Sequence, residues 1–519
     1  AERAIYRRLR KWNLPEHEWD LWHLDQRIND AGIPINMRAV RNAIRISKAA
    51  VGSRMEEMRE ITGLDNPNST QQLLPWLQGE GYPFDDLKKG HVETALKECY
   101  ERIDAGGNDL ADVYDAQSYI TSLERRLEVS RASVKKYEAL ERTTDEDGNL
   151  RNTLQFAGAG RTWRWSGRTY QPQNLARPTK DLENCLEMAV RHVEHLDPEC
   201  IEWLYEKPMD LLASCVRPVA QAPEGFLFAD ADLNAIENRV LGWVAQCLKI
   251  INVFREGRCP YVDFATAMYH QTYEELWHEY KVLEDKTKRT NAKPAVLGCG
   301  YMLSAGFEKE NPKTGEMEAT GLLGYARDMG IEMTTDQTDH AVRVFRETYE
   351  EVVQFWWDID RAVRRTIKTG RPQRLHMLTF DRSGPFLRIK LPSGRYLHYC
   401  RPRVEPKMMP WGKVKDAITY EGLNDKKQWT RIQTHPGKLT ENVVQAIARD
   451  LLAHGMVLAD REGLDIRLHV HDQIVALVPE ASAKMDLAVL QECMSVQPAW
   501  AEGLPLAADG FLSRVFKKD

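Results

Sequence analysis

The sequence predicts a mixed protein of helices and sheet, which we class as α+β. Apolar residues recur at helical spacing over long stretches, chiefly 38–141 and 235–374, whereas short apolar runs typical of strands lie near 226 and near 470. A chain of 519 residues, 43% of them apolar and 29% charged, is long enough for several subdomains around a large core. Composition and periodicity define the fold no further than this.

The first strand candidate is the apolar run Phe226-Leu227-Phe228, which leads into the stretch FADADLNAIENRV. From Ile236 onward the apolar residues turn to helical spacing, so Asp230 and Asp232 come where a strand gives way to a helix. We interpret Asp232 as functional. An isolated aspartate at a strand end often caps a helix, and this purely structural interpretation is stronger for Asp230 than for Asp232.

A second strand pattern lies far downstream, in the stretch IRLHVHDQIVALV from Ile466 to Val478. Two apolar runs flank His471-Asp472-Gln473, which predicts a β-hairpin that presents polar groups at its turn. Two carboxylates from separate strands repel unless a cation lies between them, and hard oxygen ligands suit Mg²⁺. Asp232 and Asp472 are therefore predicted to hold metal for two-metal phosphoryl chemistry, as both catalytic residues and ligands.

Three stretches in order carry a family resemblance. The segment Asp232 to Arg239 resembles motif A of family A DNA polymerases, the bacterial DNA polymerase I class; Arg289, Lys293, Leu297 and Tyr301 resemble motif B; and His471-Asp472 resembles motif C. The segments GRYLHY, KLTENVVQAIARDLL and GLPLAADGF are similar to the phage branch of that family. The resemblance implies a template-directed DNA polymerase, expected to be phage-encoded, that extends a primer with dNTPs in DNA replication.

The resemblance also implies roles for individual residues. Leu233 would add a backbone carbonyl to the metal site, which holds two Mg²⁺ ions with Mn²⁺ as a possible substitute. Glu237 resembles the side chain that excludes a ribose 2′-hydroxyl, and Tyr301 is its expected hydrogen-bond partner. The nucleotide site would comprise Arg289, Lys293, Leu297, Tyr301 and Glu237, and the DNA contacts Arg161, Arg164, Gln173, Asn174, Asn442, Gln445 and His471.

Three residues of the motifs depart from what is usual. Gln473 stands where the family usually has Glu, which puts a third carboxylate ligand in doubt. Leu297 replaces a common Phe or Tyr, although an apolar platform remains. Pro294 removes one helix hydrogen bond, so we expect it to start or kink the helix of motif B.

The resemblance implies a right-hand polymerase fold with an antiparallel-sheet palm, helical fingers and a helical thumb. Polar turns near 29–32, 66–68 and 79–83 are expected to interrupt the early helices, and one amphipathic helix is expected from about Thr440 to Glu462. The expected segments are 1–37 as an N-terminal connection to the palm, 38–141 as the thumb, 142–234 as the palm with motif A, 235–374 as the fingers with motif B, and 375–519 as the palm with motif C.

The net charge and the cysteine content limit the partners and the cellular compartment that we expect. A net charge of −6 requires that any basic DNA-binding surface be local, since only charges that reach phosphate matter. Nine cysteines without a CxxC pair argue against zinc ribbons and a disulfide framework. We expect a monomer in the cytoplasm, without membrane contact, that binds primer-template DNA and dNTPs. Replisome partners are undefined, and no acidic exonuclease motifs precede the first helix, so no proofreading is expected from this polypeptide.

Two other functions fit part of the pattern. A metal-dependent nuclease would also use paired acids, but it would not require the cations and tyrosine of motif B. A catalytically inactive DNA-binding module would have no use for clustered acids beside phosphate. Both alternatives predict failure in a primer-extension assay with Mg²⁺.

Overall fold

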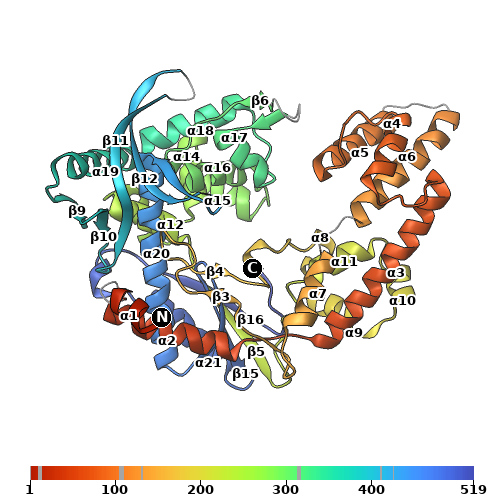
Figure 1. The fold of residues 1–519 in the computed structure, drawn as a ribbon, viewed down its shortest axis with the longest axis horizontal. Helices are drawn as coiled ribbons and strands as arrows, with labels where there is room; N and C mark the ends of the chain where they lie inside the picture. The colour runs from red at the N-terminus through yellow and green to blue at the C-terminus, as the bar shows by residue number, and fades with distance from the viewer. Residues whose placement is uncertain are drawn as a thin grey trace.

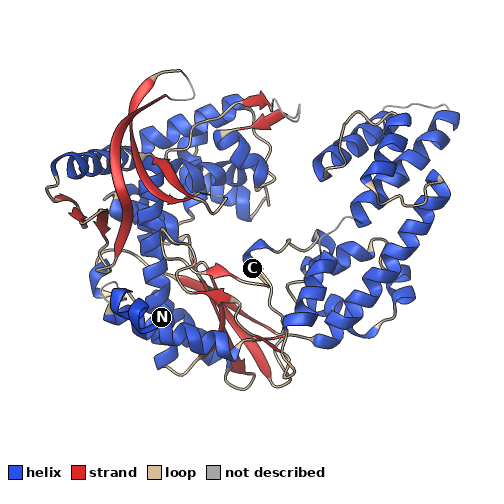
Figure 2. Cartoon of the chain, in the orientation of Figure 1, coloured by secondary structure: helices blue, strands red, loops and turns tan. Residues whose placement is uncertain are grey.

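The computed structural model describes residues 2–9, 14–104, 110–129, 133–311, 317–408, 412–424 and 426–518. Helices form two separate masses, one on each side of a small central sheet (Figures 1 and 2). This arrangement is an α+β architecture, with the antiparallel sheet at the base of the molecule and helical arms rising from both of its sides.

The central sheet is antiparallel, with strand order β14-β15-β5-β16. Its strands are β5 (Phe226–Leu233), β14 (Asp465–Val470), β15 (Gln473–Pro479) and β16 (Ala508–Ser513). Helix α21 (Ala483–Ser495) covers one face, where Ala231 and Gly510 lie opposite each other and a Cβ at 510 would come within 2.9 Å of Leu487. Since side chains alternate along a strand, Asp230 and Asp232 point to the other face.

The arm at the right of Figure 1 is helical and begins with one long helix. Helices α9 and α11 pack against that helix, α3, so residues expected to connect parts of the palm also build the base of this arm. The expected interruption at 66–68 falls between α3 and α4, and that at 79–83 begins at Gly79, the last residue of α4. The turn expected at 29–32 is wrong, because helix α2 (Glu16–Ala31) continues through Ala31 and is capped by Gly32. The elements are α3 (Met37–Thr62), α4 (Thr70–Gly79), α5 (Lys89–Asp104), α6 (Leu110–Val129), α7 (Ser133–Thr143), α8 (Lys180–Glu183), α9 (Leu186–His195), α10 (Pro198–Leu204) and α11 (Pro208–Cys215).

The opposite mass follows β5 directly and is mainly helical, as expected for 235–374. A short hairpin of β6 (Glu308–Glu310) and β7 (Met317–Ala319) interrupts it. The helices are α12 (Ile236–Val244), α13 (Leu248–Arg255), α14 (Pro260–Tyr269), α15 (Tyr273–Lys281), α16 (Thr287–Gly298), α17 (Gly321–Asp328), α18 (Thr335–Thr348) and α19 (Glu350–Thr369). Helix α16 carries motif B and packs against α14, α17 and α18.

A second antiparallel sheet lies beside this mass, in the order β13-β12-β11-β10-β9-β8. Its long β11–β12 hairpin rises along the upper left of Figure 1. The sequence indicated strands here but not that they form a sheet separate from the one bearing the aspartates. The strands are β8 (Gln373–Leu375), β9 (Leu378–Ser383), β10 (Phe386–Lys390), β11 (Tyr396–Met408), β12 (Val414–Leu423) and β13 (Trp429–Thr434).

Helix α20 (Pro436–Arg461) joins the two sheets and contacts α12, α19 and α21. It begins at Pro436, four residues before the predicted start, because proline fits the first helical position, where no backbone donor is needed. The remaining elements are α1 (Glu2–Leu9), α2 (Glu16–Ala31), β1 (Ile33–Pro34), β2 (Asn149–Leu150), β3 (Leu154–Gln155) and β4 (Ser166–Gly167). In the described ranges, no helix combines the length and apolarity that crossing a bilayer demands.

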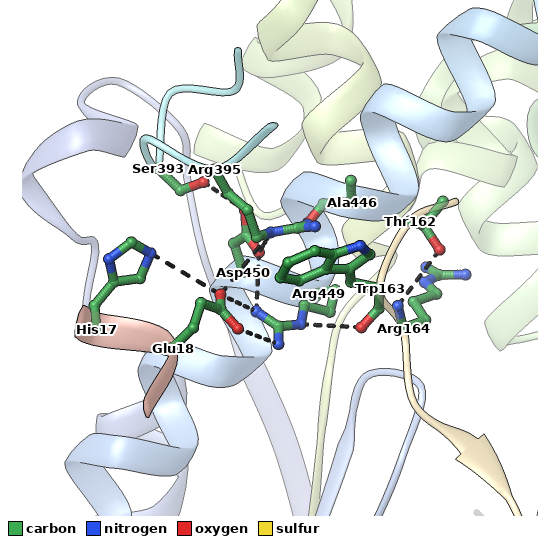
Figure 3. A network of polar contacts seen from close by, with 10 residues as sticks. All are labelled: His17, Glu18, Thr162, Trp163, Arg164, Ser393, Arg395, Ala446, Arg449 and Asp450. Atoms are coloured by element: carbon green, nitrogen blue, oxygen red, sulfur yellow. Dashed lines mark hydrogen bonds and ion pairs between the residues drawn. The ribbon is translucent and has the colours of Figure 1, made fainter. Parts of the chain in front are cut away.

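A buried ionic network fastens α2 to α20 (Figure 3). Arg449, 1% exposed, donates from Nη1 and Nη2 to the two carboxylate oxygens of Glu18 at 2.7 and 2.8 Å. Arg395 donates from Nε to Asp450 at 2.8 Å, and the Ser393 hydroxyl donates to the same carboxylate. Two arginines and two acids thus neutralise one another where water is largely excluded.

The same network holds the loop that leads to the site. Arg449 Nε donates to the Trp163 carbonyl at 3.2 Å, and the Arg395 guanidinium carbon lies 5.4 Å from the centre of the Trp163 ring (Figure 3). Trp163 has φ 64°, a left-handed conformation that strains a bulky residue. Contacts from two buried arginines stabilise this turn and so fix the direction in which Arg164 leaves it.

Substitution of Glu18 by Ala should strongly destabilise the protein. The change leaves the Arg449 charge buried without its bidentate partner, which costs about 3–5 kcal/mol. The exposed Asp20 on the same helix provides the matched control, because Asp20→Ala should change stability little. Calorimetric melting of both variants measures the difference, and equal melting temperatures would show that the network does not stabilise the fold.

Candidate active site

The two predicted aspartates come together through strand pairing. Asp232 is the penultimate residue of β5, and Asp472 lies in the two-residue turn between β14 and β15. The register places Gln473 opposite Asp232, and the Leu233 amide donates to the Asp472 carbonyl at 3.0 Å. The predicted hairpin, and the assembly of one carboxylate from each strand, are confirmed.

The electrostatics of this pair favour a bound cation. Burial, followed by the neighbouring charge of Asp232, raises the pKa of Asp472 from 3.8 to about 7. Both carboxylates line a cavity of about 500 Å³ together with Lys293, Asp509 and Lys518. Within the described ranges, no three His, Cys, Asp or Glu side chains are placed to hold a metal ion. Ions held by the two aspartates would therefore need further oxygens, such as those of water or substrate.

A smaller adjoining cavity of about 270 Å³ contains the predicted sugar-selecting residues. Tyr301 donates its hydroxyl proton to Glu237 at 2.9 Å, so the predicted hydrogen bond is confirmed. Leu297 lines the same cavity, together with both aspartates. Burial and the Glu237 carboxylate raise the pKa of Tyr301, which keeps the phenol protonated as a donor.

Glu237 has a second partner that the sequence did not indicate. Arg164 donates from Nη2 to Glu237 at 2.6 Å. The alternative partner considered for Glu237 was Arg239, but that side chain turns away and donates to the carbonyls of Asn234 and Pro505. Glu237 is therefore held between a tyrosine of one arm and an arginine of the 159–165 loop.

The cations of motif B lie against aromatic rings. The Arg289 guanidinium carbon is 4.8 Å from the Tyr280 ring centre and 5.1 Å from that of Tyr261. Lys293 Nζ is 5.9 Å from the Tyr261 ring centre, and burial together with neighbouring Arg289 lowers the pKa of Lys293. Cations that repel one another and lose hydration gain from a bound polyanion, which would raise the pKa of Lys293 again.

The local structure of motif B differs from the prediction in two respects. Helix α16 begins at Thr287, so Pro294 lies inside it and does not start it. Tyr301 lies on a 3₁₀ turn (Cys299–Tyr301) that follows the α-helix, not on the helix itself. Tight packing favours glycine here, since a Cβ at Gly300 would come within 2.4 Å of Leu241.

The predicted DNA-contacting residues occupy very different surroundings. Gln173 and His471 line the larger cavity beside the aspartates. Arg161 instead lies over the rings of Tyr399 and Tyr420, at 4.7 and 4.3 Å, and donates to the His398 carbonyl. Three others make local contacts: Asn442 is buried and donates to the Tyr399 hydroxyl, Gln445 donates to Glu441, and Asn174 donates to Gln171.

Reasoning from the sequence did not identify several residues of the site. Asp230 is a buried strand residue and not a helix cap, and Gln473 Nε2 donates to both of its carboxylate oxygens at 2.7 Å. Asp509 lies opposite Asp232 on β16, and Lys518 lines the same cavity. The similarity of the segment GLPLAADGF to the phage branch was a signal for Asp509, whereas Lys518 had none.

The fold and the paired aspartates identify a polymerase domain. The structure resembles the polymerase domain of Pol1 from M. smegmatis, solved in complex with DNA primer-template and dNTP, with a TM-score of 0.56 and 15% identity; the match covers 94% of this chain and 68% of that one. No protein-family profile matches the chain. The DNA polymerase of Bacillus phage SP02 is 34% identical over 520 residues, which span 100% of this chain and 74% of the relative. The chain belongs to the phage-type branch of the family A DNA polymerases.

Gly437, the second residue of α20, lies close to the backbone of Tyr301 in this site. A Cβ added there would lie 2.1 Å from the Tyr301 carbonyl oxygen, so Gly437→Ala should displace Tyr301 or the start of α20. We expect a loss of about 1–3 kcal/mol of stability and reduced polymerase activity. Gly90, also second in its helix, has nothing within 4 Å of a new Cβ, so Gly90→Ala is the control. Equal melting temperatures and activities for the two variants would contradict the packing argument.

Proposed function

We propose that the chain extends a DNA primer with dNTPs along a template by two-metal nucleotidyl transfer at Asp232 and Asp472. The observation that carries this proposal is the pairing of β5 with β15, which brings the two carboxylates to the same cavity as the cation Lys293. Paired acids beside a cation suit a reaction in which metal ions bridge the protein to a triphosphate.

The donor set fits Mg²⁺, because the two carboxylates are hard oxygen ligands whose mutual repulsion a cation relieves. Asp232 and Asp472 would hold two ions, and the Leu233 carbonyl would add an oxygen. When bound there, the ions would supply acidification of the primer 3′-hydroxyl and neutralisation of the charge on the triphosphate and on the departing pyrophosphate. Mn²⁺, also an oxygen-preferring ion, is the expected substitute.

The side chains of α16 would bind and orient the nucleotide. Arg289 suits bidentate contacts to phosphate oxygens, and Lys293 acts as a point charge on the same face of the helix. Leu297 would support the base, and Glu237, held by Tyr301 and Arg164, would lie against the sugar. Gln173, Asn174, Gln445 and His471 are the proposed contacts to primer and template.

Two predicted DNA contacts acquire more specific roles. Arg164 would reach primer or template only after leaving Glu237, so DNA binding would exchange one partner for another. Arg161 and Asn442 both contact Tyr399, and we propose that they support the DNA-binding surface from behind. We propose that 38–141 acts as the thumb, 235–374 as the fingers, and 142–234 and 375–519 as the palm, with 1–37 as a connection to the palm, and that the chain acts as a monomer.

Asp232→Asn and Asp472→Asn should each abolish primer extension while primer-template binding persists. Neutralisation removes a metal ligand that supplies several kcal/mol in the transition state, so the extension rate should fall by at least about a hundredfold. Phosphate contacts from other residues remain, so DNA affinity in a gel-shift or anisotropy assay should change little. Near wild-type extension by both variants would refute the assignment, and DNA degradation by the unmodified protein without extension would favour a nuclease.

Glu237→Ala should raise insertion of ribonucleotides relative to deoxynucleotides, because the space for a 2′-hydroxyl opens. Removal of a close steric contact is worth roughly tenfold or more in discrimination. Single-nucleotide insertion kinetics with matched rNTP and dNTP give the ratio. Glu274→Ala is the control, since Glu274 lies in the first turn of α15, as Glu237 lies in the first turn of α12, but is exposed where Glu237 is half-buried. An unchanged ratio for Glu237→Ala would show that this residue does not select the sugar.

A further inference from the structure

The pair formed by Asp230 and Gln473 has no assigned role and adjoins the two aspartates of the site. Asp230 is 2% exposed, and both of its carboxylate oxygens accept from Gln473 Nε2 at 2.7 Å. Both residues line the cavity that contains Asp232 and Asp472. The pair is thus built into the wall of the site and not into the hydrophobic core.

The sheet register explains why these two side chains meet. Asp232 and Gln473 are direct cross-strand neighbours, and Asp230 stands opposite Val475, one step further along the same face. The Gln473 amide therefore reaches diagonally to Asp230, a distance that a long side chain can span. Because Gln473 directly follows Asp472, its hydrogen bonds also anchor the turn that presents the second aspartate.

The distribution of charge across this face carries the inference. This chain has an amide at Gln473 and a buried carboxylate at Asp230 on the adjacent strand. A carboxylate at both positions would place two like charges within hydrogen-bond distance in a buried setting, which is strongly unfavourable. An amide at both positions would remove one negative charge from the site.

We propose that Asp230 adds a buried negative charge to the site of Asp232 and Asp472, and that Gln473 holds this carboxylate in place. The added charge strengthens the attraction of the site for divalent cations. Asp230 is not proposed to be a metal ligand. It acts on the cations through its charge and on Asp472 through the hydrogen-bonded turn, so it is a positioning residue. The inference rests on the proposed two-metal function of Asp232 and Asp472.

Exchange of the two groups tests the proposal. Three variants are needed: Asp230→Asn, Gln473→Glu, and the double variant that carries both changes. Asp230→Asn should weaken divalent cation binding by roughly 10- to 100-fold, the usual effect of disrupting groups that support metal ligands, whereas Gln473→Glu adds a negative charge and should not weaken it. The double variant restores one carboxylate and one amide, so it should recover affinity to within a few-fold of the unmodified protein.

Cation binding is measured without catalysis, from the electron paramagnetic resonance signal of free Mn²⁺ titrated with protein alone. The Mg²⁺ concentration that gives half-maximal primer extension provides a second readout. Asp465→Asn is the matched control, because Asp465 is an acid on β14 of the same sheet, remote from the cavity and paired with Arg467. Melting temperatures of all variants separate a loss of folding from a loss of cation binding.

Two results would overturn the proposal. One is an Asp230→Asn variant with unchanged Mn²⁺ affinity and Mg²⁺ dependence, which would make the pair purely structural. The other is a folded double variant that binds Mn²⁺ no better than the weaker single variant. The proposed function and this inference would fail in different ways. Retained primer extension by Asp232→Asn would contradict the proposed function. An inactive Asp232→Asn variant together with either result above would contradict only this inference.

Discussion

The structure depends on the pairing of β15 with β5. This pairing joins residues more than 200 positions apart and sets two negative charges side by side, an arrangement that electrostatics alone would oppose. It persists because the opposite face of the sheet is apolar and closely covered: Ala229, Ala231 and Ile474 are buried, and α21 packs on their face. Burial of that face stabilises the sheet, and the polar face is left for chemistry.

The arms are connected to this sheet through polar contacts that meet near Glu237. Arg164 approaches from a loop fixed by Arg449 and hence by Glu18 on the second helix, while Tyr301 approaches from the end of α16. Segments near residues 18, 163, 237, 301 and 449 therefore share one chain of hydrogen bonds. A change in the position of α16 or of the 159–165 loop must alter the surroundings of Glu237, so the setting of this carboxylate and the position of the arm are physically linked.

Sequence alone predicted most of the site, because its motifs are local. The strand before Asp232 and the hairpin around Asp472 follow from short patterns, and the family resemblance implied the Tyr301 hydrogen bond to Glu237. It could not predict which arginine of the 159–165 loop faces Glu237, since the left-handed turn at Trp163 is stabilised by residues almost 300 positions away. For the same reason Asn442 could not be assigned to a buried contact with Tyr399, and Asp230 was taken for a cap. Long-range pairing decides the face on which a side chain lies.

The two-residue turn between β14 and β15 also limits how this chain can diverge. Side chains in a strand alternate between faces, so a residue inserted or lost between His471 and the middle of β15 would turn Gln473 or its successors toward α21. Replacement of one polar group by another keeps every residue on its own face. Substitutions along this hairpin can therefore change the chemistry of the polar face, whereas insertions and deletions would move its side chains to the face that α21 covers.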